Sequence, residues 1–252
     1  MLVLLPPSEG KAPGGDGPPL QLEQLSRPEL TPVRRRLVDA LGQAARTDPE
    51  GLRAALGCTP GQAGEVAQDA RLLDSPTLPA LQRYTGVVYD NLGYATLSGP
   101  ARRRADASLA VASALFGLLQ PRDRVPAYRL SGGTSLPGVG SLAALWRPAL
   151  EPVLAGARGL VVDLRSGAYA ALARVPGAVQ VRVLRDEGGR RTVVSHDNKH
   201  TKGRLARALC EHGARGLADL AELGREVADD VEVEGRRVDL VLHGLASARA
   251  AR

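Results

Sequence analysis

Two continuous apolar runs constrain the fold of this chain more than any other feature of its sequence. Residues 1–5 read Met-Leu-Val-Leu-Leu and stop at Pro6-Pro7, and residues 159–164 read Gly-Leu-Val-Val-Asp-Leu. Apolar runs that do not alternate with polar residues are typical of strands that are buried on both faces of a sheet. Each run is therefore predicted to form a buried strand.

Helical and hairpin patterns accompany these two strands. Leu, Ala and Val recur at helical spacing over 28–57 and 60–73, and each segment has a proline in its first helical turn. No repeat and no shift in composition marks a domain boundary, so the expected fold is a mixed α/β single domain over 1–252, a mixed β-sheet with surrounding helices. Further helices are predicted over 99–106 and about 202–211, and hairpins are predicted to pair 180–185 with 191–195 and 231–233 with 238–242.

The composition narrows the partners and the location that we expect. A net charge of +6 and a pI near 9.8 favour a polyanionic partner, either nucleic acid or a phosphorylated small molecule. Cys58 and Cys210 belong to no Cys-x-x-Cys pattern, and His196 and His200 have no third ligand nearby, so we expect no metal and no cofactor. No signal peptide and no stretch of about 18 apolar residues is visible, which predicts a cytoplasmic protein without a membrane segment.

Lysine is rare in this chain: only Lys11, Lys199 and Lys202 stand among 33 basic residues. The abundance of Ala, Gly, Pro and Arg indicates a drift that replaces surface lysine by arginine wherever charge alone matters. A lysine that survives is then a candidate for work that a guanidinium cannot do, because lysine is a compact point charge whose pKa falls on burial. The alternative is that the three are leftover surface lysines.

Six short segments together are more specific than any one of them. They are Leu5-Pro-Pro-Ser-Glu-Gly-Lys11, Tyr84-Thr-Gly-Val-Val-Tyr89, Ser113-Ala-Leu-Phe-Gly-Leu-Leu-Gln-Pro-Arg-Asp123, Pro126-Ala-Tyr-Arg-Leu130, Asp163-Leu-Arg-Ser-Gly-Ala-Tyr169 and Ser195-His-Asp-Asn-Lys-His-Thr-Lys-Gly203. In this order they resemble the YaaA family of bacterial peroxide-stress proteins, in an actinobacterial-type branch. The resemblance implies a compact α/β fold with a positively charged cleft and a helix-hairpin-helix element, binding to duplex or branched DNA, and a role in limiting iron-dependent oxidative damage.

One further segment resembles a helix-hairpin-helix turn on its own residues. Residues 135–145 read Ser-Leu-Pro-Gly-Val-Gly-Ser-Leu-Ala-Ala-Leu, and the element would cover about 135–150. Gly138 and Gly140 would let the backbone turn tightly and approach a phosphate, which would then face the amides that start the next helix. The alternative is a plain Pro-Gly turn before a helix that packs through Leu142 and Trp146.

Candidate site residues lie mostly at strand ends and turns within these segments. Lys11 follows a strand and a glycine, and Asp163 ends the second apolar run as either a site residue or a helix cap. If the protein is an enzyme, Lys11, Asp163 and Lys199 are the candidate catalytic residues. The candidates for binding a substrate or DNA are Ser8, Tyr84, Tyr89, Tyr128, Arg129, Gly138, Gly140, Ser166, Tyr169, His200 and Lys202.

Two functions remain open at this stage. The first is sequence-independent DNA binding through phosphate contacts, to which the arginine runs 34–36 and 102–104, interpreted as solvated helix faces, could contribute. The second is an enzyme that acts on a nucleotide, a nucleobase or another small anionic substrate. An enclosed pocket in which the candidate side chains converge would favour the enzyme, whereas a broad groove would favour DNA.

Overall fold

A computed structural model describes residues 1–244, and its main sheet is built on the two predicted strands. β1 (Leu2–Leu5) pairs in parallel with β4 (Leu109–Ser113) on one side and with β9 (Val161–Asp163) on the other. β10 (Val179–Glu187) and β13 (Arg237–His243) extend the parallel part beyond β9. The antiparallel strands are β5 (Gly117–Leu119) on β4, β12 (Asp230–Glu234) on β13 and β11 (Arg190–Thr192) on β10.

The order of the parallel strands places a site. Across the sheet they run β4-β1-β9-β10-β13, so the strand that comes first in the chain lies between the second and the third. The chain therefore leaves β1 in one direction along the sheet and returns to its other side at β9. In open α/β sheets, ligands bind beyond the carboxyl ends of the strands at this kind of reversal. A ligand site is therefore expected beyond the carboxyl ends of β1 and β9.

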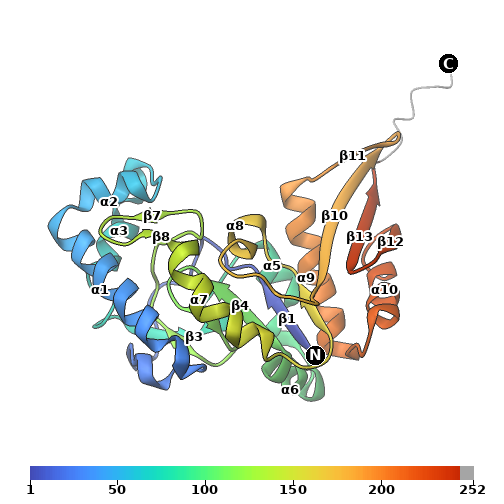
Figure 1. Ribbon diagram of the computed structural model, residues 1–252, viewed down its shortest axis with the longest axis horizontal. Helices are drawn as coiled ribbons and strands as arrows, with labels where there is room; N and C mark the ends of the chain where they lie inside the picture. The colour runs from blue at the N-terminus through green and yellow to red at the C-terminus, as the bar shows by residue number, and fades with distance from the viewer. Residues whose placement is uncertain (245–252) are drawn as a thin grey trace.

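Helices pack around the sheet, and α1, α2 and α3 extend the molecule to one side (Figure 1). The first three helices form one side of the molecule, α9, α10, β12 and β13 form the other, and α7 and α8 lie between them. The helices are α1 (Thr31–Thr47), α2 (Pro49–Ala55), α3 (Ala63–Asp69), α4 (Ala80–Arg83), α5 (Val87–Leu92), α6 (Gly99–Ser108), α7 (Leu142–Ala155), α8 (Gly167–Ala170), α9 (Ser195–His212) and α10 (Leu217–Arg225).

Short elements complete the connections. The smaller strands are β2 (Gly17–Pro19), β3 (Pro76–Pro79), β6 (Arg124–Val125), β7 (Ser135–Leu136) and β8 (Gly140–Ser141). Single 3-10 turns form at Leu22–Gln24, Pro28–Leu30, Pro60–Gln62 and Tyr94–Thr96. Helices form in the predicted segments, but residues 28–57 hold two of them, α1 and α2, and α9 begins at Ser195 rather than near residue 202. Both predicted hairpins form, although β11 ends at Thr192 rather than at residue 195.

The core is continuous and consists mainly of Leu, Val and Ala. Trp146 of α7 is fully buried and donates from its ring nitrogen to the carbonyl of Ala114, 2.7 Å away. Its ring lies so close to Gly117 that a Cβ there would sit 2.7 Å from it. Because Gly117 also has a φ of +73°, glycine is required at this position for two reasons.

The interpretation of the first arginine run as a solvated face is wrong for Arg34. This residue is fully buried, and its guanidinium donates to the carbonyls of Phe116 (2.9 Å) and Leu118 (3.0 Å). Those carbonyls belong to the β4–β5 turn and to β5, which lies at the edge of the sheet as the structure describes it, so Arg34 donates where a further strand would otherwise do so. Arg34 thus fastens α1 to the sheet edge, while Arg35 and Arg36 are exposed as expected.

The helix-hairpin-helix prediction is also corrected. Residues 126–134 contain no helix, and the segment instead forms the two-stranded β7–β8 hairpin, which leads into α7. Two glycines in a row, Gly132 and Gly133, disfavour a helix before the hairpin. Gly138 and Gly140 do adopt the positive φ angles that a tight turn needs, +73° and +84°.

Candidate functional site

A cleft of about 610 Å³ opens beyond the carboxyl ends of β1 and β9, at the reversal in strand order. Sites for small ligands usually measure about 300–1,000 Å³, so this volume suits a metabolite. Five segments line it: the loop after β1, the start of α5, the loop at 131–133, the turn before and into α8, and one face of α9. Segments that resemble the family therefore converge here from opposite ends of the chain.

The loop after β1 is held by side chains that point back into it. The Ser8 hydroxyl donates to the carbonyl of Gly10 (2.6 Å) and accepts from the amide of Thr85 (3.1 Å). The Tyr89 hydroxyl donates to the carbonyl of Pro6 at 2.8 Å. These bonds fasten the loop to the start of α5, so Ser8 and Tyr89 line the cleft with their polar atoms already engaged.

The opposite wall is one face of α9. Ser195, Asn198, Lys199 and Lys202 line the cleft, and their spacing of three and four residues places them on one side of a helix. The next residue, Gly203, allows α9 to approach α5 closely, because a Cβ there would sit 2.5 Å from the Val88 carbonyl oxygen. Close packing between the two helices thus sets the position of this wall.

Lys202 is the chemically distinctive residue of the wall. Only 6% of it is exposed, and no described residue accepts a hydrogen bond or forms an ion pair with its ammonium. Burial lowers the pKa of Lys202 to about 8, and the negative charge of Asp163 offsets part of that effect. Because Lys202 lines the cleft, its ammonium can donate hydrogen bonds to a ligand that binds there.

Asp163 is not free to act on a lysine. Both of its carboxylate oxygens are bound by the side chain of Arg165, at 2.9 and 2.8 Å, and the Arg165 amide donates to one of them at 3.0 Å. Asp163 does not cap α8, whose N-cap is Ser166, and it is not among the residues that line the cleft. It lines a neighbouring hollow of about 400 Å³, which shares Ser166, Asn198 and Lys202 with the cleft.

Lys11 lies behind the cleft loop rather than on the cleft surface. Its ammonium donates to the carbonyls of Ser8 (3.3 Å) and Glu9 (3.1 Å) and lies 4.2 Å from the centre of the Tyr128 ring. Burial, followed by the positive charge of Arg129, lowers the pKa of Lys11 to about 8. Its donors are used to close the loop, so a role as a nucleophile in the cleft is not supported by its position.

Arg129 is likewise occupied. Its guanidinium pairs with Glu9 and with Glu65 of α3, both at 3.1 Å, which leaves it poorly placed to clamp a phosphate. Its backbone amide donates to Asp69 at 2.9 Å, while the second oxygen of the fully buried Asp69 has no hydrogen-bond partner. Burial raises the pKa of Asp69 to about 8, so this carboxyl is largely neutral at pH 7.

The tyrosines divide between the cleft and the layer beneath it. Tyr89 and Tyr169 line the cleft, and Tyr169 packs on Gly132, where a Cβ would meet its ring at 3.1 Å. Tyr84 and Tyr128 are buried below, where their hydroxyls bond to each other at 2.8 Å and Tyr128 also bonds to Ser113 at 2.8 Å. These four tyrosines therefore gather in one region, although only Tyr89 and Tyr169 line the cleft.

Of the predicted site residues, the structure brings one group to the cleft and leaves others outside. Ser8, Tyr89, Ser166, Tyr169, Lys199 and Lys202 line it. Gly138, Gly140 and His200 do not line it. Sequence reasoning missed Asn198, Thr85 and the Ser131-Gly132-Gly133 loop as lining residues, although Asn198 stands beside Lys199 in a quoted segment.

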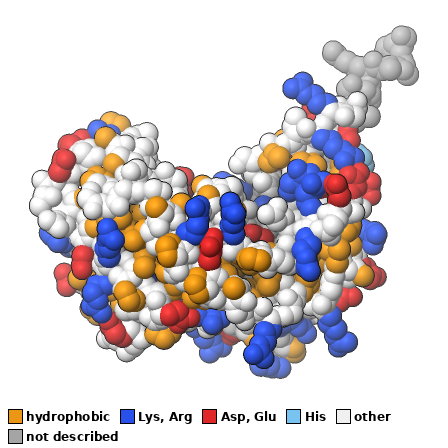
Figure 2. Space-filling view, in the orientation of Figure 1, with side chains coloured by type: hydrophobic (Ala, Val, Ile, Leu, Met, Phe, Trp, Pro, Cys, Tyr) orange, Lys and Arg blue, Asp and Glu red, His pale blue; other side chains and the backbone are white. Residues whose placement is uncertain are grey.

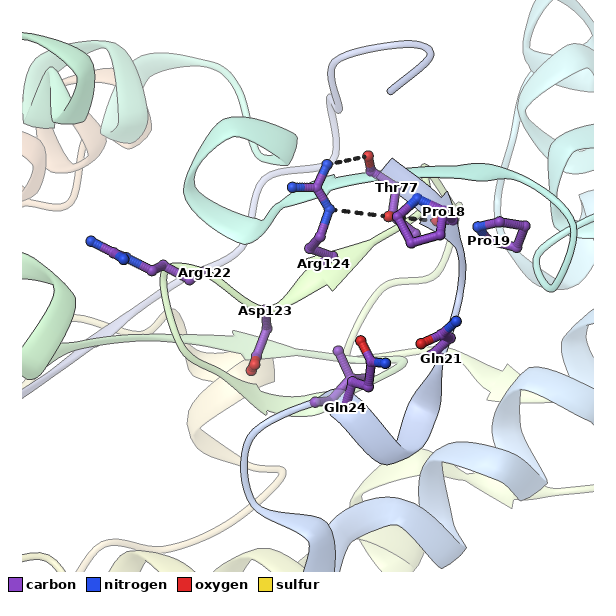
Figure 3. Close-up of a pocket in the computed structure, with 9 residues that line it drawn as sticks. Pro18, Pro19, Gln21, Gln24, Thr77, Arg122, Asp123 and Arg124 are labelled. Atoms are coloured by element: carbon purple, nitrogen blue, oxygen red, sulfur yellow. Dashed lines mark hydrogen bonds between the residues drawn. The ribbon is translucent and has the colours of Figure 1, made fainter. Parts of the chain in front are cut away.

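A separate hollow of about 200 Å³ is shown in Figure 3, and its polar groups are bound by the chain itself. Asp123 at its edge accepts from Ser26 and from the Gln120 amide, and Arg124 bonds to Thr77. These polar groups are satisfied by the chain itself. Within residues 1–244, no cluster of His, Cys, Asp and Glu could hold a metal ion, and no helix is both long and apolar enough to cross a membrane.

Fold and cleft together define an α/β protein with a ligand-sized crevice at the reversal point of a parallel sheet. A family model described as "Peroxide stress protein YaaA" matches residues 1–227, and the chain therefore belongs to this family. A UPF0246 protein from Corynebacterium efficiens is 45% identical over 250 residues, which cover 96% of this chain and 99% of that protein. Another, from Streptomyces coelicolor, is 46% identical over 243 residues and 93% of each chain.

Proposed function

We propose that this member of the peroxide-stress family binds a nucleotide or another small anionic molecule in the cleft at β1 and β9. The observation that carries the proposal is Lys202, which lines a 610 Å³ cleft and whose ammonium has no hydrogen-bond acceptor among the described residues. Lys199 on the same helix face adds a second positive charge. An anion in the cleft would accept charge-assisted hydrogen bonds from Lys202.

The direct test is calorimetric titration with inorganic phosphate, ribose 5-phosphate and AMP, together with thermal melts. A ligand at 100 times its Kd should stabilise the fold by about 2.7 kcal/mol. Lys202→Met should remove the heat of binding, whereas Arg35→Lys, far from the cleft and exposed, should leave it unchanged. If no anion in the panel binds, or if Lys202→Met binds as well as wild type, the proposal is wrong.

DNA binding without sequence preference is the second candidate. Figure 2 shows a hollow between the α1–α3 side and the β10–β13 side, with basic side chains spread over this face. The charge of +6 also favours a polyanion. Several exposed arginines are already paired with acidic side chains and are therefore less available to DNA phosphates, as in Arg35 with Glu23 and Arg191 with Glu232. We rank DNA second for that reason.

A salt titration of DNA binding separates the two candidates. Affinity for a fluorescent duplex that depends on six to ten phosphate contacts should fall about 10³- to 10⁵-fold between 50 and 200 mM salt. Lys202→Met should leave such binding nearly intact, because only 6% of Lys202 is exposed and phosphates on the outer surface would contact other cations. Protection of cells from iron-dependent oxidative damage would be the cellular outcome of either activity, and peroxide survival of a complemented deletion strain measures it.

A further inference from the structure

Lys202 has a property that anion binding alone does not require. Lys202 lines both the cleft and the adjoining 400 Å³ hollow, and only 6% of the residue is exposed. No described residue accepts a hydrogen bond from its ammonium. With a pKa of about 8, roughly a quarter of this amine is neutral at pH 7.5, against about 0.1% for an ordinary lysine. Lysines that form covalent bonds to carbonyl carbons have this combination of burial and access.

We propose that Lys202 forms a reversible imine with an aldehyde or 2-oxo acid that carries a carboxylate or phosphate and binds in the cleft. The proposal deepens the proposed function and rests on it, because the same cleft must first bind the anionic part of the molecule. It names the class of ligand, an anionic carbonyl compound, and the atom that reacts with it.

The step balances without an oxidant or a reductant. The Lys202 ammonium first releases a proton to solvent, and its nitrogen lone pair forms a bond to the carbonyl carbon. The carbonyl oxygen takes up protons and leaves as water while the carbon–nitrogen double bond forms. The resulting imine is protonated on nitrogen and keeps one positive charge in the wall of the cleft, and hydrolysis by water reverses the step.

The surroundings of Lys202 suit this class of ligand. Lys199 lies three residues earlier on the same helix face and is exposed, so it can pair with the anionic group at the cleft mouth. No side chain caps the start of α9, whose first amides can donate to an anion, and Ser195 lies at that end. A ligand whose anion sits at the start of α9 can thus extend along the face towards Lys202.

The other two lysines are placed differently. The Lys11 ammonium donates to two backbone carbonyls and lies over a tyrosine ring. Lys199 is exposed to solvent. An arginine could bind an anion in place of any of them, but its guanidinium cannot form an imine. Lys202 is therefore the lysine whose amine the cleft both shields and presents.

The test uses pyridoxal 5′-phosphate, an aldehyde with a phosphate, followed by borohydride reduction, which converts an imine to a stable secondary amine. Because the chain has only three lysines and one N-terminal amine, peptide mass mapping assigns each adduct to one residue. We expect one adduct per chain, at Lys202, formed about tenfold or more faster than at Lys199. Lys202→Met should lose it, and Lys199→Arg should retain it at Lys202.

Several outcomes would overturn the inference. It fails if the adducts follow exposure, so that Lys199 or the N-terminus is modified first, or if a folded Lys202→Met variant is labelled to the same extent. Equal labelling by pyridoxal, which lacks the phosphate, would refute the anionic ligand class. Pyridoxine 5′-phosphate, an alcohol, binds without an imine. If it binds but no adduct forms at Lys202, only the imine is wrong, and if neither occurs, the proposed function fails as well.

Discussion

The half-buried Lys11 and the buried Lys202 both have a pKa lowered to about 8, yet their surroundings differ. The region around Lys11, beneath the cleft loop, is closed by polar contacts to Ser8, Glu9 and Tyr128. The region around Lys202, in the α9 wall, holds its amine by helix packing and offers it no partner. The lowered pKa therefore does not distinguish the two lysines, whereas their partners and their access to the cleft do.

Different interactions hold the loop after β1 and the α9 wall in place. The loop side depends on hydrogen bonds among Ser8, Thr85, Tyr89 and neighbouring carbonyls. The α9 side depends on the close approach of α5, which Gly203 permits. Substitutions that remove single hydrogen bonds should therefore weaken the first region gradually, while added volume should disrupt the second sharply.

The largest effect is expected from Gly203→Ala. The added Cβ would meet the Val88 carbonyl oxygen at 2.5 Å and the Asn91 Cβ at 2.7 Å, so α5 and α9 must separate. Urea unfolding should show a destabilisation of about 3 kcal/mol. Binding in the cleft should weaken as well, because the α9 wall moves.

The matched control is Gly64→Ala, at an exposed helical glycine of α3 where an added Cβ meets nothing within 4 Å. This change should stabilise the protein by about 0.5–1 kcal/mol, since alanine favours helix. Equal effects of the two substitutions would contradict the view that helix packing sets the cleft wall.

The next largest effect is a difference in the free energy of unfolding between the variants Lys11→Met and Lys202→Met. Lys11→Met removes two hydrogen bonds and a cation–ring contact, and should lower the free energy of unfolding by about 1–2 kcal/mol. Lys202→Met removes a buried charge without a partner and should leave stability unchanged or raise it by up to about 1 kcal/mol. Denaturant melts of both variants at one pH provide the measurement. The comparison breaks if Lys202→Met is the more destabilised variant.

Much of the fold could be predicted from the sequence, because it depends on local patterns. The uninterrupted apolar runs at residues 1–5 and 159–164 form the neighbouring strands β1 and β9. The hairpins at β10–β11 and β12–β13 follow from alternation and glycine turns. The buried Arg34 could not be predicted, since its acceptors lie in β5 and the preceding turn, more than 80 residues away.

The cleft residues could be predicted from the sequence only in part. Ser8, Tyr89, Ser166, Tyr169, Lys199 and Lys202 line the cleft, whereas Lys11, Asp163 and Arg129 do not. Which lysine faces that cleft depends on the partners of each, and Arg165 beside Asp163 or Glu65 beside Arg129 are visible only in three dimensions. The turn at Gly138 and Gly140 shows the same limit, because its glycines fit a hairpin whether helices or strands flank it.

A pH effect of intermediate size is expected at Asp69, beneath the loop side. Its folded pKa of about 8 lies above the ordinary 3.8, so the folded protein holds a proton that the unfolded chain releases between these values. Stability from this group is therefore present at low pH and is lost as pH rises towards 8. The positive charges of Lys11 and Arg129 and the negative charge of Glu65 all act on it.

Asp69→Asn removes this titration while keeping an oxygen that can accept from the Arg129 amide. The stability of the variant relative to wild type should therefore rise between pH 5.5 and 7.5, by at most about 1.4 kcal/mol per pH unit. Urea unfolding at three pH values measures the difference. Parallel curves for the two proteins would show that Asp69 ionises normally despite its burial.

The smallest effect is expected at Lys199, the exposed lysine of the α9 wall. Lys199→Gln should weaken the binding of a small anion roughly threefold, because an exposed ion pair contributes less than about 1 kcal/mol in water. The loss should shrink as salt is added, since solvent screens a charge at the cleft mouth more than one inside it. Titrations of AMP at 50 and 300 mM salt test this, with Lys202→Met as the reference for a loss that persists at high salt. If Lys199→Gln weakens binding as strongly as Lys202→Met at both salt concentrations, the anion binds at the mouth of the cleft, and the distinction between the two lysines of α9 is lost.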